Sequence, residues 1–483
     1  MIAVIGAGPA GLAAAWRASR AGHEVVVLER APVVGGMAGS FEVAGLRVDH
    51  GSHRLHPATP PPILSALRQL LGADLQVRPR HGRIRLLDRW VAFPLRTGDL
   101  LRSAPPAFAV RAARDAVVSP LRRPRADTFA EVVRSGLGPA VLDAFYGPYA
   151  AKLWDTPPAD LAGELARRRV GTSSPRDVVR RLARGARPEG RTFLYPRRGY
   201  GAIAEALADA AAAAGADIRL GCGVSRLTAP APGPGAGAGA VPSSGSVPSP
   251  RAVGGSAGWR LDLDDGSRLD VAHVWSTAPL GALAGAVEPP PPASVVEAAG
   301  RLRHRAMVLL YLVLDRPRWS EFDAHYFPGP DVLATRLSEP RNYRDSRDDP
   351  PDRTVLCAEI ACWADDATWR AEDGELAARL ADELARLGLP PVRPVAVVSR
   401  RLPRVYPVYR PDFGDDLAEL EAWASRLAGL VTFGRQGLFT PDNTHHALAM
   451  GWAAADALGP DGSFDAATWT AARDGFRRFV VED

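Results

Sequence analysis

The stretch that decides the fold is Ile2–Glu29, with the sequence IAVIGAGPAGLAAAWRASRAGHEVVVLE. Its apolar run Ile2–Ile5 predicts a short β-strand, and Glu24–Leu28 predicts a second strand that leads into Glu29. Between the two strands, a G-x-G-x-x-G motif opens a helix rich in alanine. Strand, glycine-rich turn, helix, strand and acid in this order predict a βαβ unit that binds a dinucleotide, although the motif alone does not separate NAD from FAD.

Each glycine of the motif has its own task. Gly6 allows the tight turn, Gly8 lets a pyrophosphate approach the backbone, and Gly11 lets the helix pack closely on the strand. The helix N-terminus offers free N–H groups and the positive end of its dipole to the phosphates. Glu29 is placed to accept hydrogen bonds from the hydroxyls of the adenosine ribose. The cofactor-binding residues predicted here are Gly6, Gly8, Pro9, Ala10, Gly11, Glu29 and Arg30.

Two further features favour FAD. Gly35 and Gly36, followed by Met37, would bring a second backbone segment close to the phosphates. Near the C-terminus, the run VTFGRQGLFTPDNTHHALAMGWAAADAL predicts a strand, a loop and then a helix of small residues from about Thr444. The N-terminus of this helix could face a flavin ring, whose N1–C2 carbonyl region gains negative charge on reduction. The alternative is a helix that only closes the core.

Six further blocks of sequence accompany these motifs. They are DHGSHRLH (49–56), YAAKLWDTPPADL (149–161), YPRRGYGAIAEAL (195–207), TRLSE (335–339), YPVY (406–409) and FGRQGLF (433–439). With these blocks the chain resembles the flavoproteins of the amine oxidase and protoporphyrinogen oxidase superfamily, and looks closest to the branch that includes the UDP-galactopyranose mutases. The resemblance implies FAD as cofactor and an α/β (α+β) fold, in which a Rossmann-like FAD-binding domain of the glutathione-reductase-2 type is interleaved with a substrate-binding domain of mixed sheet and helices.

The two domains are expected to alternate along the chain. We assign residues 1–89, 195–285 and 425–483 to the FAD-binding domain and residues 90–194 and 286–424 to the substrate domain. The run APAPGPGAGAGAVPSSGSVPSP after Thr228 lacks aromatic and charged side chains and cannot contribute to a core. We therefore expect a disordered loop at about 229–258, inserted into a hairpin.

The resemblance also assigns residues beside the flavin ring and the substrate. The segment Gly51, Ser52 and His53 would lie by the isoalloxazine ring, so that His53 and His56 become candidate catalytic residues. Arg336 matches an arginine that is associated with the substrate pocket of the mutases, and we include it among the candidate catalytic residues.

Further cofactor contacts are implied in the second half of the chain. Val224 would contact the adenine through its backbone. Gly434 and Arg435 belong to the flavin-binding C-terminal block, and Asn443 and Thr444 begin the helix expected to face the flavin.

The chain departs from the mutases at two places. They usually carry a second phosphate-binding arginine a few residues after the position of Arg169, whereas the nearest arginine after Val170 is here Arg176. They also carry paired tyrosines where this chain has Pro441 and Asp442. A nucleotide diphosphate needs several cationic and aromatic contacts, so these departures argue against a UDP-sugar substrate.

Lys152 is the only lysine of the chain. It could shape the substrate pocket beside Tyr149 and Trp154 as a compact donor whose pKa falls on burial, and for this reason it is a candidate catalytic residue. Alternatively, it pairs with Asp155 or Asp160 and only positions the substrate domain.

Composition narrows the remaining functions. The formal charge of +5 is small beside 59 basic and 54 acidic residues, and no basic block is interleaved with aromatics, so we expect no nucleic-acid partner. The three cysteines show no metal-ligand spacing, and we predict no metal site. No signal peptide is expected before the first strand, and no apolar run reaches the roughly 20 residues that span a bilayer. We expect a cytoplasmic protein, and we favour a solvated helical face over membrane contact for residues 99–125.

Three functions remain open. The first is an FAD-dependent oxidoreductase that transfers hydride from a C–N, C–C or C–O bond of a small molecule to flavin N5. The second is a non-redox sugar mutase that needs reduced FAD, and the third is a flavin binder without catalysis. Several arginines around the pocket would suit an anionic or sugar-containing substrate, and nothing in the sequence indicates an oligomeric state.

Overall fold

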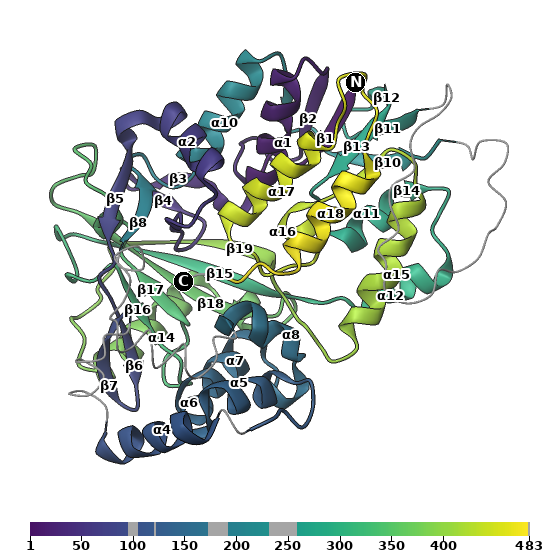
Figure 1. Cartoon of the computed structure of the whole chain (residues 1–483). Helices are drawn as coiled ribbons and strands as arrows, with labels where there is room; N and C mark the ends of the chain where they lie inside the picture. The colour runs from purple at the N-terminus through teal and green to yellow at the C-terminus, as the bar shows by residue number, and fades with distance from the viewer. Residues whose placement is uncertain (95–104, 120–121, 172–191, 231–257, 482–483) are drawn as a thin grey trace.

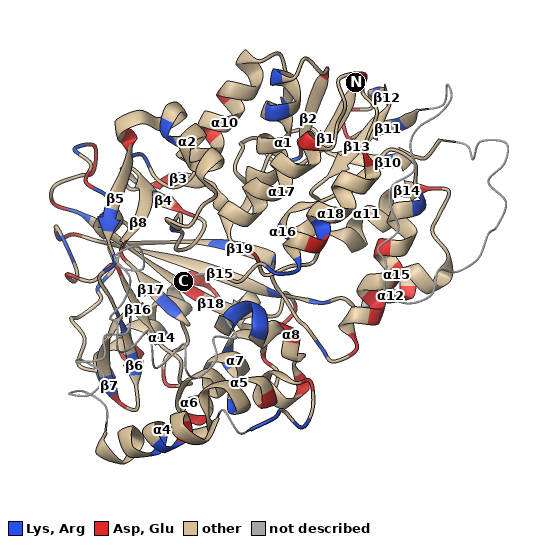
Figure 2. Ribbon diagram, in the orientation of Figure 1, with Lys and Arg blue, Asp and Glu red and all other residues tan. Residues whose placement is uncertain are grey.

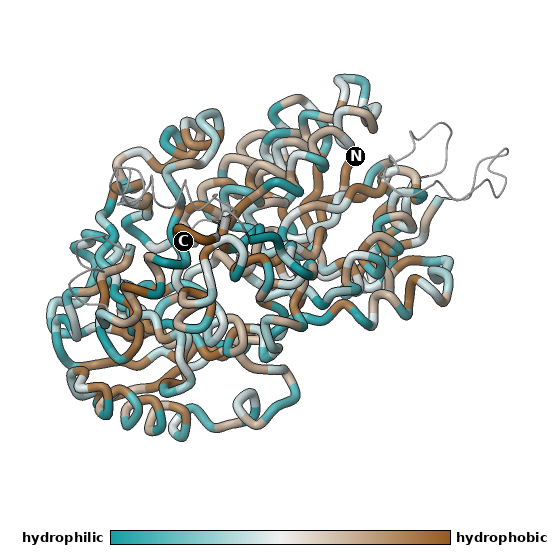
Figure 3. Tube along the Cα trace, turned by 60° about the horizontal axis from the view of Figure 1, so that its bottom comes forward, coloured by the Kyte–Doolittle hydropathy of each residue, from teal (hydrophilic) through white to brown (hydrophobic). Residues whose placement is uncertain are grey.

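The computed structural model describes residues 1–483 except 95–104, 120–121, 172–191, 231–257 and 482–483. Figure 1 shows a layer of strands and helices that holds the N-terminus, a large sheet next to it, and a group of helices on the far side of that sheet. Figure 3 shows hydrophobic residues (brown) spread along the whole chain, and separate clusters of buried hydrophobic residues lie in the first layer, the large sheet and the helical group. Each layer therefore has its own core.

The first layer is a five-stranded parallel sheet in the order β20-β13-β1-β2-β9. Both predicted strands and the predicted helix of the βαβ unit are present, with the helix α1 between β1 and β2. The Rossmann-like fold class is thereby confirmed. The sheet combines distant parts of the chain, with the bounds β1 Ile2–Ile5, α1 Pro9–Arg20, β2 Val25–Glu29, β9 Asp217–Leu220, β13 His273–Ser276 and β20 Leu430–Thr432.

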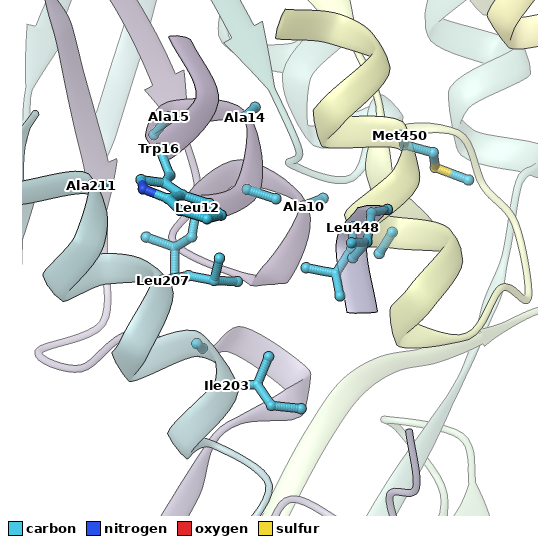
Figure 4. Packing of buried hydrophobic residues seen from close by; sticks show 14 of the residues in the cluster. Ala10, Leu12, Ala14, Ala15, Trp16, Ile203, Leu207, Ala211, Leu448 and Met450 are labelled. Atoms are coloured by element: carbon cyan, nitrogen blue, oxygen red, sulfur yellow. The ribbon is translucent and has the colours of Figure 1, made fainter. Parts of the chain in front are cut away.

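Helix α1 packs between α10 (Ala202–Ala213) and α17 (Thr444–Asp456), as Figure 4 shows. Alanines such as Ala10, Ala14 and Ala211 let the helix axes approach, and larger side chains such as Leu207 and Leu448 fill the space beside them. The closest approach is at Gly451, where a Cβ atom would overlap the carbonyl oxygen of Ala10. This packing fixes the N-termini of α1 and α17 relative to each other.

A four-stranded sheet in the order β12-β11-β10-β14 adjoins the first layer. Its strands are β10 Val224–Thr228, β11 Trp259–Leu263, β12 Arg268–Val271 and β14 Val287–Glu288. Strands β10 and β11 pair antiparallel, as expected for a hairpin. The loop predicted between them at 229–258 lies almost entirely outside the described residues.

The second layer is a seven-stranded sheet in the order β19-β15-β18-β17-β16-β6-β7. Its long central strands are β15 and β18, and α14 (Asp373–Arg386) packs against the sheet. The sheet includes β6 and β7, which form one hairpin, although the predicted domain boundary at 89/90 would separate them. A boundary before β6 describes this hairpin better, because its two strands share a ladder. The bounds are β6 Gly82–Leu86, β7 Arg89–Phe93, β15 His304–Leu314, β16 Ala324–Tyr326, β17 Arg336–Ser338, β18 Thr354–Cys362 and β19 Ala396–Pro407.

The third group consists of helices between residues 106 and 171. Those at 129–137 and 142–166 share a core with Tyr409 and Phe439, which ties them to the first two layers, whereas Phe108 and Ala140 form a separate small cluster. Their bounds are α4 Pro106–Val118, α5 Phe129–Leu137, α6 Pro139–Val141, η4 Leu142–Tyr146, α7 Gly147–Trp154, α8 Gly163–Ala166 and η6 Arg167–Gly171. Within the described residues, every helix is too short or too polar to cross a bilayer, and the cytoplasmic location stays a prediction.

The remaining elements connect or cover these layers. They are β3 Ser40–Val43, β4 Leu46–Asp49, α2 Pro61–Leu71, β5 Leu75–Pro79, β8 Thr192–Pro196, α11 Leu280–Ala286, α12 Ala293–Arg301, α13 Ala367–Arg370, α15 Phe413–Arg426, α16 Gly434–Gly437 and α18 Ala466–Phe476, with short 3-10 turns between them.

Candidate active site

A cavity of about 840 Å³ is lined by residues of both the parallel and the seven-stranded sheet. Most of the residues predicted from the sequence line it. They are Gly6, Gly8, Pro9, Ala10, Glu29, Arg30, Gly36, Met37, Gly51, Ser52, His53, Val224, Arg336, Gly434, Arg435, Asn443 and Thr444. Four predicted residues do not line it, namely Gly11, Gly35, His56 and Lys152.

The turn before α1 opens directly on this cavity. Gly6 has a φ of +102°, and a Cβ there would overlap the Thr277 hydroxyl, while a Cβ at Gly11 would overlap the Gly6 carbonyl oxygen. Gly8 differs, because a Cβ there would meet no atom within 4 Å. Gly6 and Gly11 are therefore required by the protein's own packing, whereas Gly8 leaves open space in front of the N-terminus of α1.

Glu29 ends β2 at the edge of the same cavity. One carboxylate oxygen accepts a hydrogen bond from the Ala7 N–H at 2.8 Å, and the other accepts one from the Ala31 N–H at 2.9 Å. The two bonds hold the carboxylate in one orientation. Its remaining lone pairs can accept the hydroxyls of a ribose, and Val224 lines the same end of the cavity.

Two of the sequence blocks meet at Asp49, which the sequence analysis did not single out as a site residue. Its carboxylate accepts hydrogen bonds from the Ser40 hydroxyl at 2.6 Å, the Tyr200 N–H at 2.9 Å and the Tyr195 hydroxyl. Burial raises the pKa of Asp49, and these hydrogen bonds oppose the rise. Asp49 therefore fixes the turn that begins at Gly51 against the block of residues 195–207.

Arg336 forms a bidentate ion pair with Glu359 on β18. The Nε–Oε1 distance is 3.0 Å and the Nη2–Oε2 distance is 2.8 Å, and the Glu359 carboxylate is almost fully buried. Oε1 of Glu359 also accepts the Ser52 N–H at 2.7 Å. Glu359 thus joins Arg336 to the turn at 51–53. Sequence reasoning missed it, although a single acid in the otherwise apolar strand TVLCAEIAC was a usable signal.

His53 faces the cavity from the same turn. Its ring stacks on Tyr200, with the ring centroids 5.1 Å apart and the planes inclined by 19°. Burial lowers the pKa of His53 to about 3, and the nearby charge of Arg336 acts in the same direction. The imidazole is therefore neutral at physiological pH. By contrast, Nδ1 of His56 accepts the Ala58 N–H at 3.1 Å, and its side chain stays outside the cavity lining.

Arg435 closes the cavity next to the N-terminus of α17. Its guanidinium donates to backbone carbonyl oxygens of Val405 at 2.7 Å and Asp442 at 2.8 Å. Burial lowers the pKa of Arg435. The guanidinium groups of Arg435 and Arg169 both lie near the Tyr406 ring, with Cζ atoms 5.4 and 5.5 Å from its centroid. Figure 2 shows basic residues just after α8 and on β17, along the border between the layers.

Lys152 on α7 lies outside the cavity. Its Nζ donates to three backbone carbonyl oxygens, of Phe327 at 2.7 Å, Gly329 at 3.0 Å and Ala334 at 2.7 Å. Burial lowers its pKa to about 7. This differs from both predicted roles, because the ammonium neither enters the cavity nor pairs with a neighbouring aspartate. Lys152 instead holds the loop that leads into β17 and Arg336.

A parallel βαβ unit that opens on a cavity, with an acid at the end of β2 and a second helix N-terminus at the same cavity, is the arrangement of a dinucleotide-binding protein. The chain belongs to the flavin-containing amine oxidoreductase family, whose model matches residues 9–414. FAD is the cofactor, and the open space at Gly8, the fixed carboxylate of Glu29 and the lining of the cavity fit it.

Solved structures show the same fold. A reduced UDP-galactopyranose mutase is 18% identical with a TM-score of 0.75, and the match covers 100% of this chain and 99% of the mutase. A protein from Exiguobacterium sp. assigned as a protoporphyrinogen oxidase is 17% identical with a TM-score of 0.68 and 98% coverage of both chains. Putrescine oxidase bound to putrescine is 18% identical, with a TM-score of 0.60 and coverage of 94% and 98%. No curated protein sequence matches the chain.

Proposed function

We propose that this protein is an FAD-dependent oxidoreductase that removes hydride from a C–N, C–C or C–O bond of a small anionic or sugar-containing molecule. One observation carries the proposal: the space in front of Gly8 and Glu29 and the space beside Arg336 and Tyr406 belong to a single cavity. Bound FAD supplies the hydride acceptor at its N5 atom. The side chains of the protein then have to bind the substrate, orient it and exclude water.

The basic wall of the cavity is proposed to hold the anionic or polar part of the substrate. Arg435 gives its described hydrogen bonds to neutral carbonyl groups, so its charge contributes to a positive potential beside Tyr406. The charge of Arg336 is balanced by Glu359, which suits a donor that orients the substrate. His53, being neutral, can both accept and donate a hydrogen bond at its ring nitrogens.

A sugar mutase of the UDP-galactopyranose type is the second candidate. Arg169 and Arg336 both line the cavity, which keeps two cationic contacts for a nucleotide sugar. Against it, Pro441 and Asp442 line the cavity at the positions of the mutase tyrosines, and Arg176 lies outside the described residues. A flavin binder without catalysis is the third candidate, and the organised wall of Arg336, Glu359 and His53 argues against it.

The test is a comparison of two assays on the purified holoprotein. The visible absorbance spectrum first establishes that flavin is bound. Candidate amines, hydroxy acids and glycosides are then offered to oxidised enzyme with O₂, and nucleotide sugars to enzyme reduced with dithionite. Oxidative turnover supports the first proposal, and isomerisation that requires reduced enzyme supports the mutase. Absence of flavin overturns both.

A further inference from the structure

The segment after α18, residues 477–481, leaves the first layer and runs toward the seven-stranded sheet, where it appears as the yellow trace below α18 in Figure 1. Helix α18 itself is anchored in the core of the parallel sheet through Trp469 and Phe476. The segment has no helical or strand structure of its own. It therefore depends on side-chain and backbone anchors for its position.

Two anchors fix the segment, one on α17 and one on η6. The ring of Phe479 stacks on His446 of α17, with centroids 4.3 Å apart and planes inclined by 8°. Two residues later, the Val481 N–H donates to the carbonyl oxygen of Arg168 in η6 at 2.7 Å. The segment thus bridges α17 in the first layer and η6 in the helical group.

Both anchor points adjoin residues that line the cavity. His446 lies two residues after Thr444, and Arg168 directly precedes Arg169; Thr444 and Arg169 both line it. Val481 lines the cavity as well and is 7% exposed. Val480 points outward and is 38% exposed. Of these two adjacent valines, Val481 therefore lies in the wall of the cavity and Val480 lies on the surface of the protein.

The η6 end of the bridge is held by a second set of contacts. Nε of Arg168 donates to Glu164 at 2.9 Å, and its Nη1 lies 3.7 Å from the buried carboxylate of Asp442. Asp442 is in the loop that leads into α17. The segment therefore lies over a place where η6 and α17 already approach each other. Its bridging contacts there are the stacked ring of Phe479 and the hydrogen bond of Val481, and nearer α18 the segment is held by the stacking of Phe479 on Phe476 and by an ion pair of 3.7 Å between Arg477 and Glu421. Such a small number of contacts allows local opening without unfolding of either layer.

We propose that residues 477–481 form a strap that closes the flavin and substrate cavity between α17 and η6, and that Val481 is the residue that controls access to it. The strap is proposed for the protein with FAD bound. It rests on the proposed function only in the statement that a substrate passes the strap. Release of Phe479 or truncation of Val481 opens the cavity to solutes. A larger side chain at position 481 narrows the entrance to the cavity.

The experiment measures access to the bound flavin and needs no substrate. The rate at which dithionite reduces the flavin is followed by the loss of visible absorbance in a stopped-flow instrument, and quenching of flavin fluorescence by acrylamide serves as a second probe. The variants are Val481→Ala, Val481→Trp and Phe479→Ala, with Val480→Ala and Val480→Trp as matched controls. Flavin content and thermal midpoint are recorded for each variant.

We expect several-fold faster reduction and stronger quenching in Val481→Ala and Phe479→Ala, slower reduction in Val481→Trp, and wild-type values in both Val480 variants. Equal values for the Val480 and Val481 variants overturn the strap. If Val481→Trp does not fold, Val481→Ala and Phe479→Ala still test the strap, because these substitutions only remove atoms and introduce no steric overlap. A protein that shows the access differences but oxidises nothing contradicts the proposed function and supports the strap.

Discussion

The cofactor end and the proposed substrate end of the cavity are built in different ways. At the cofactor end, the turn at Gly6–Ala10 presents its backbone to the cavity, and the glycines of the motif differ in what a side chain would meet. At the substrate end, the surface consists of side chains from separate elements, namely Tyr149 on α7, Arg169 on η6, Arg336 on β17, Glu359 on β18 and Tyr406 on β19.

This difference has a consequence for how each end tolerates change. A backbone surface is fixed by its dihedral angles and by close packing, so one added methyl group can destroy it. A side-chain surface can be altered residue by residue while the fold persists, which is how one fold serves oxidases and isomerases. Variants at the two ends should therefore fail in different ways.

The largest effect is expected for Gly11→Val. Its Cβ would overlap the carbonyl oxygen of Gly6, which is backbone and cannot move aside, so α1 would be displaced from β1 at a cost of about 3 kcal/mol or more. Gly8→Val is the matched variant, because Gly8 has an extended backbone with φ of −78° and open space at its Cβ. We expect it to fold normally and to lose FAD, since the added side chain fills the pyrophosphate position.

Thermal unfolding of the apoproteins and the flavin content of the purified proteins measure the two effects separately. Similar losses of stability in both variants would contradict the distinction between a packing glycine and a cofactor glycine.

A smaller effect is expected at the substrate end for Glu359→Gln. It leaves the buried guanidinium of Arg336 without a carboxylate, which costs roughly 2–4 kcal/mol. The double variant Glu359→Leu/Arg336→Met removes both charges and should recover much of the loss in urea unfolding, without recovering activity. If the double variant is as unstable as the sum of its single changes, the pair does not act as a unit.

The same contrast explains what the sequence could predict. The βαβ unit and its lining glycines followed from a local motif, because a backbone site is encoded in consecutive residues. Other lining residues, such as His53, Val224 and Arg336, followed only from the resemblance to a known family. Glu359 and Asp49 were missed, because their partners lie far away along the chain and only the tertiary fold brings them together. Asp49 accepts from Tyr200, and Glu359 from Ser52, across separations that no spacing rule covers.

Lys152 shows most clearly which contacts could not be predicted from the sequence. Its uniqueness in an arginine-rich chain suggested a special role, and its neighbours in sequence suggested ion pairs with Asp155 or Asp160. Its acceptors are carbonyl groups of a loop more than 170 residues away. Backbone carbonyls carry no residue identity, so this partner could not be found from the sequence.

The next effect in size concerns this lysine. Lys152→Met leaves three carbonyl oxygens without their donor and should cost about 1–3 kcal/mol. Lys152→Arg should recover only part of it, because the planar guanidinium cannot direct three N–H groups from one nitrogen. Because the loop leads into β17, the activity of both variants should fall through displacement of Arg336. Wild-type stability and turnover in Lys152→Arg would make the lysine a remnant without a specific role.

The smallest effect is a pH dependence at His53. Its pKa is about 3 in the folded protein against 6.5 when unfolded, so below pH 6.5 the unfolded chain takes up a proton that the native ring refuses. The contribution of His53 is therefore complete above pH 6.5 and is lost as the pH falls toward 3. His325, with a pKa of about 3, and His304, with a pKa of about 4, have the same sign, so His53 supplies only a part of the total.

The measurement is the thermal midpoint of wild type and His53→Asn between pH 7.5 and pH 5. Wild type should lose more stability on acidification than the variant, because asparagine does not titrate, and between pH 7 and pH 9 neither protein should show a change that originates at this position. A steeper acid loss in His53→Asn would mean that the native imidazole is protonated, and the neutral donor and acceptor assigned to the substrate end would then have to be replaced by a cation.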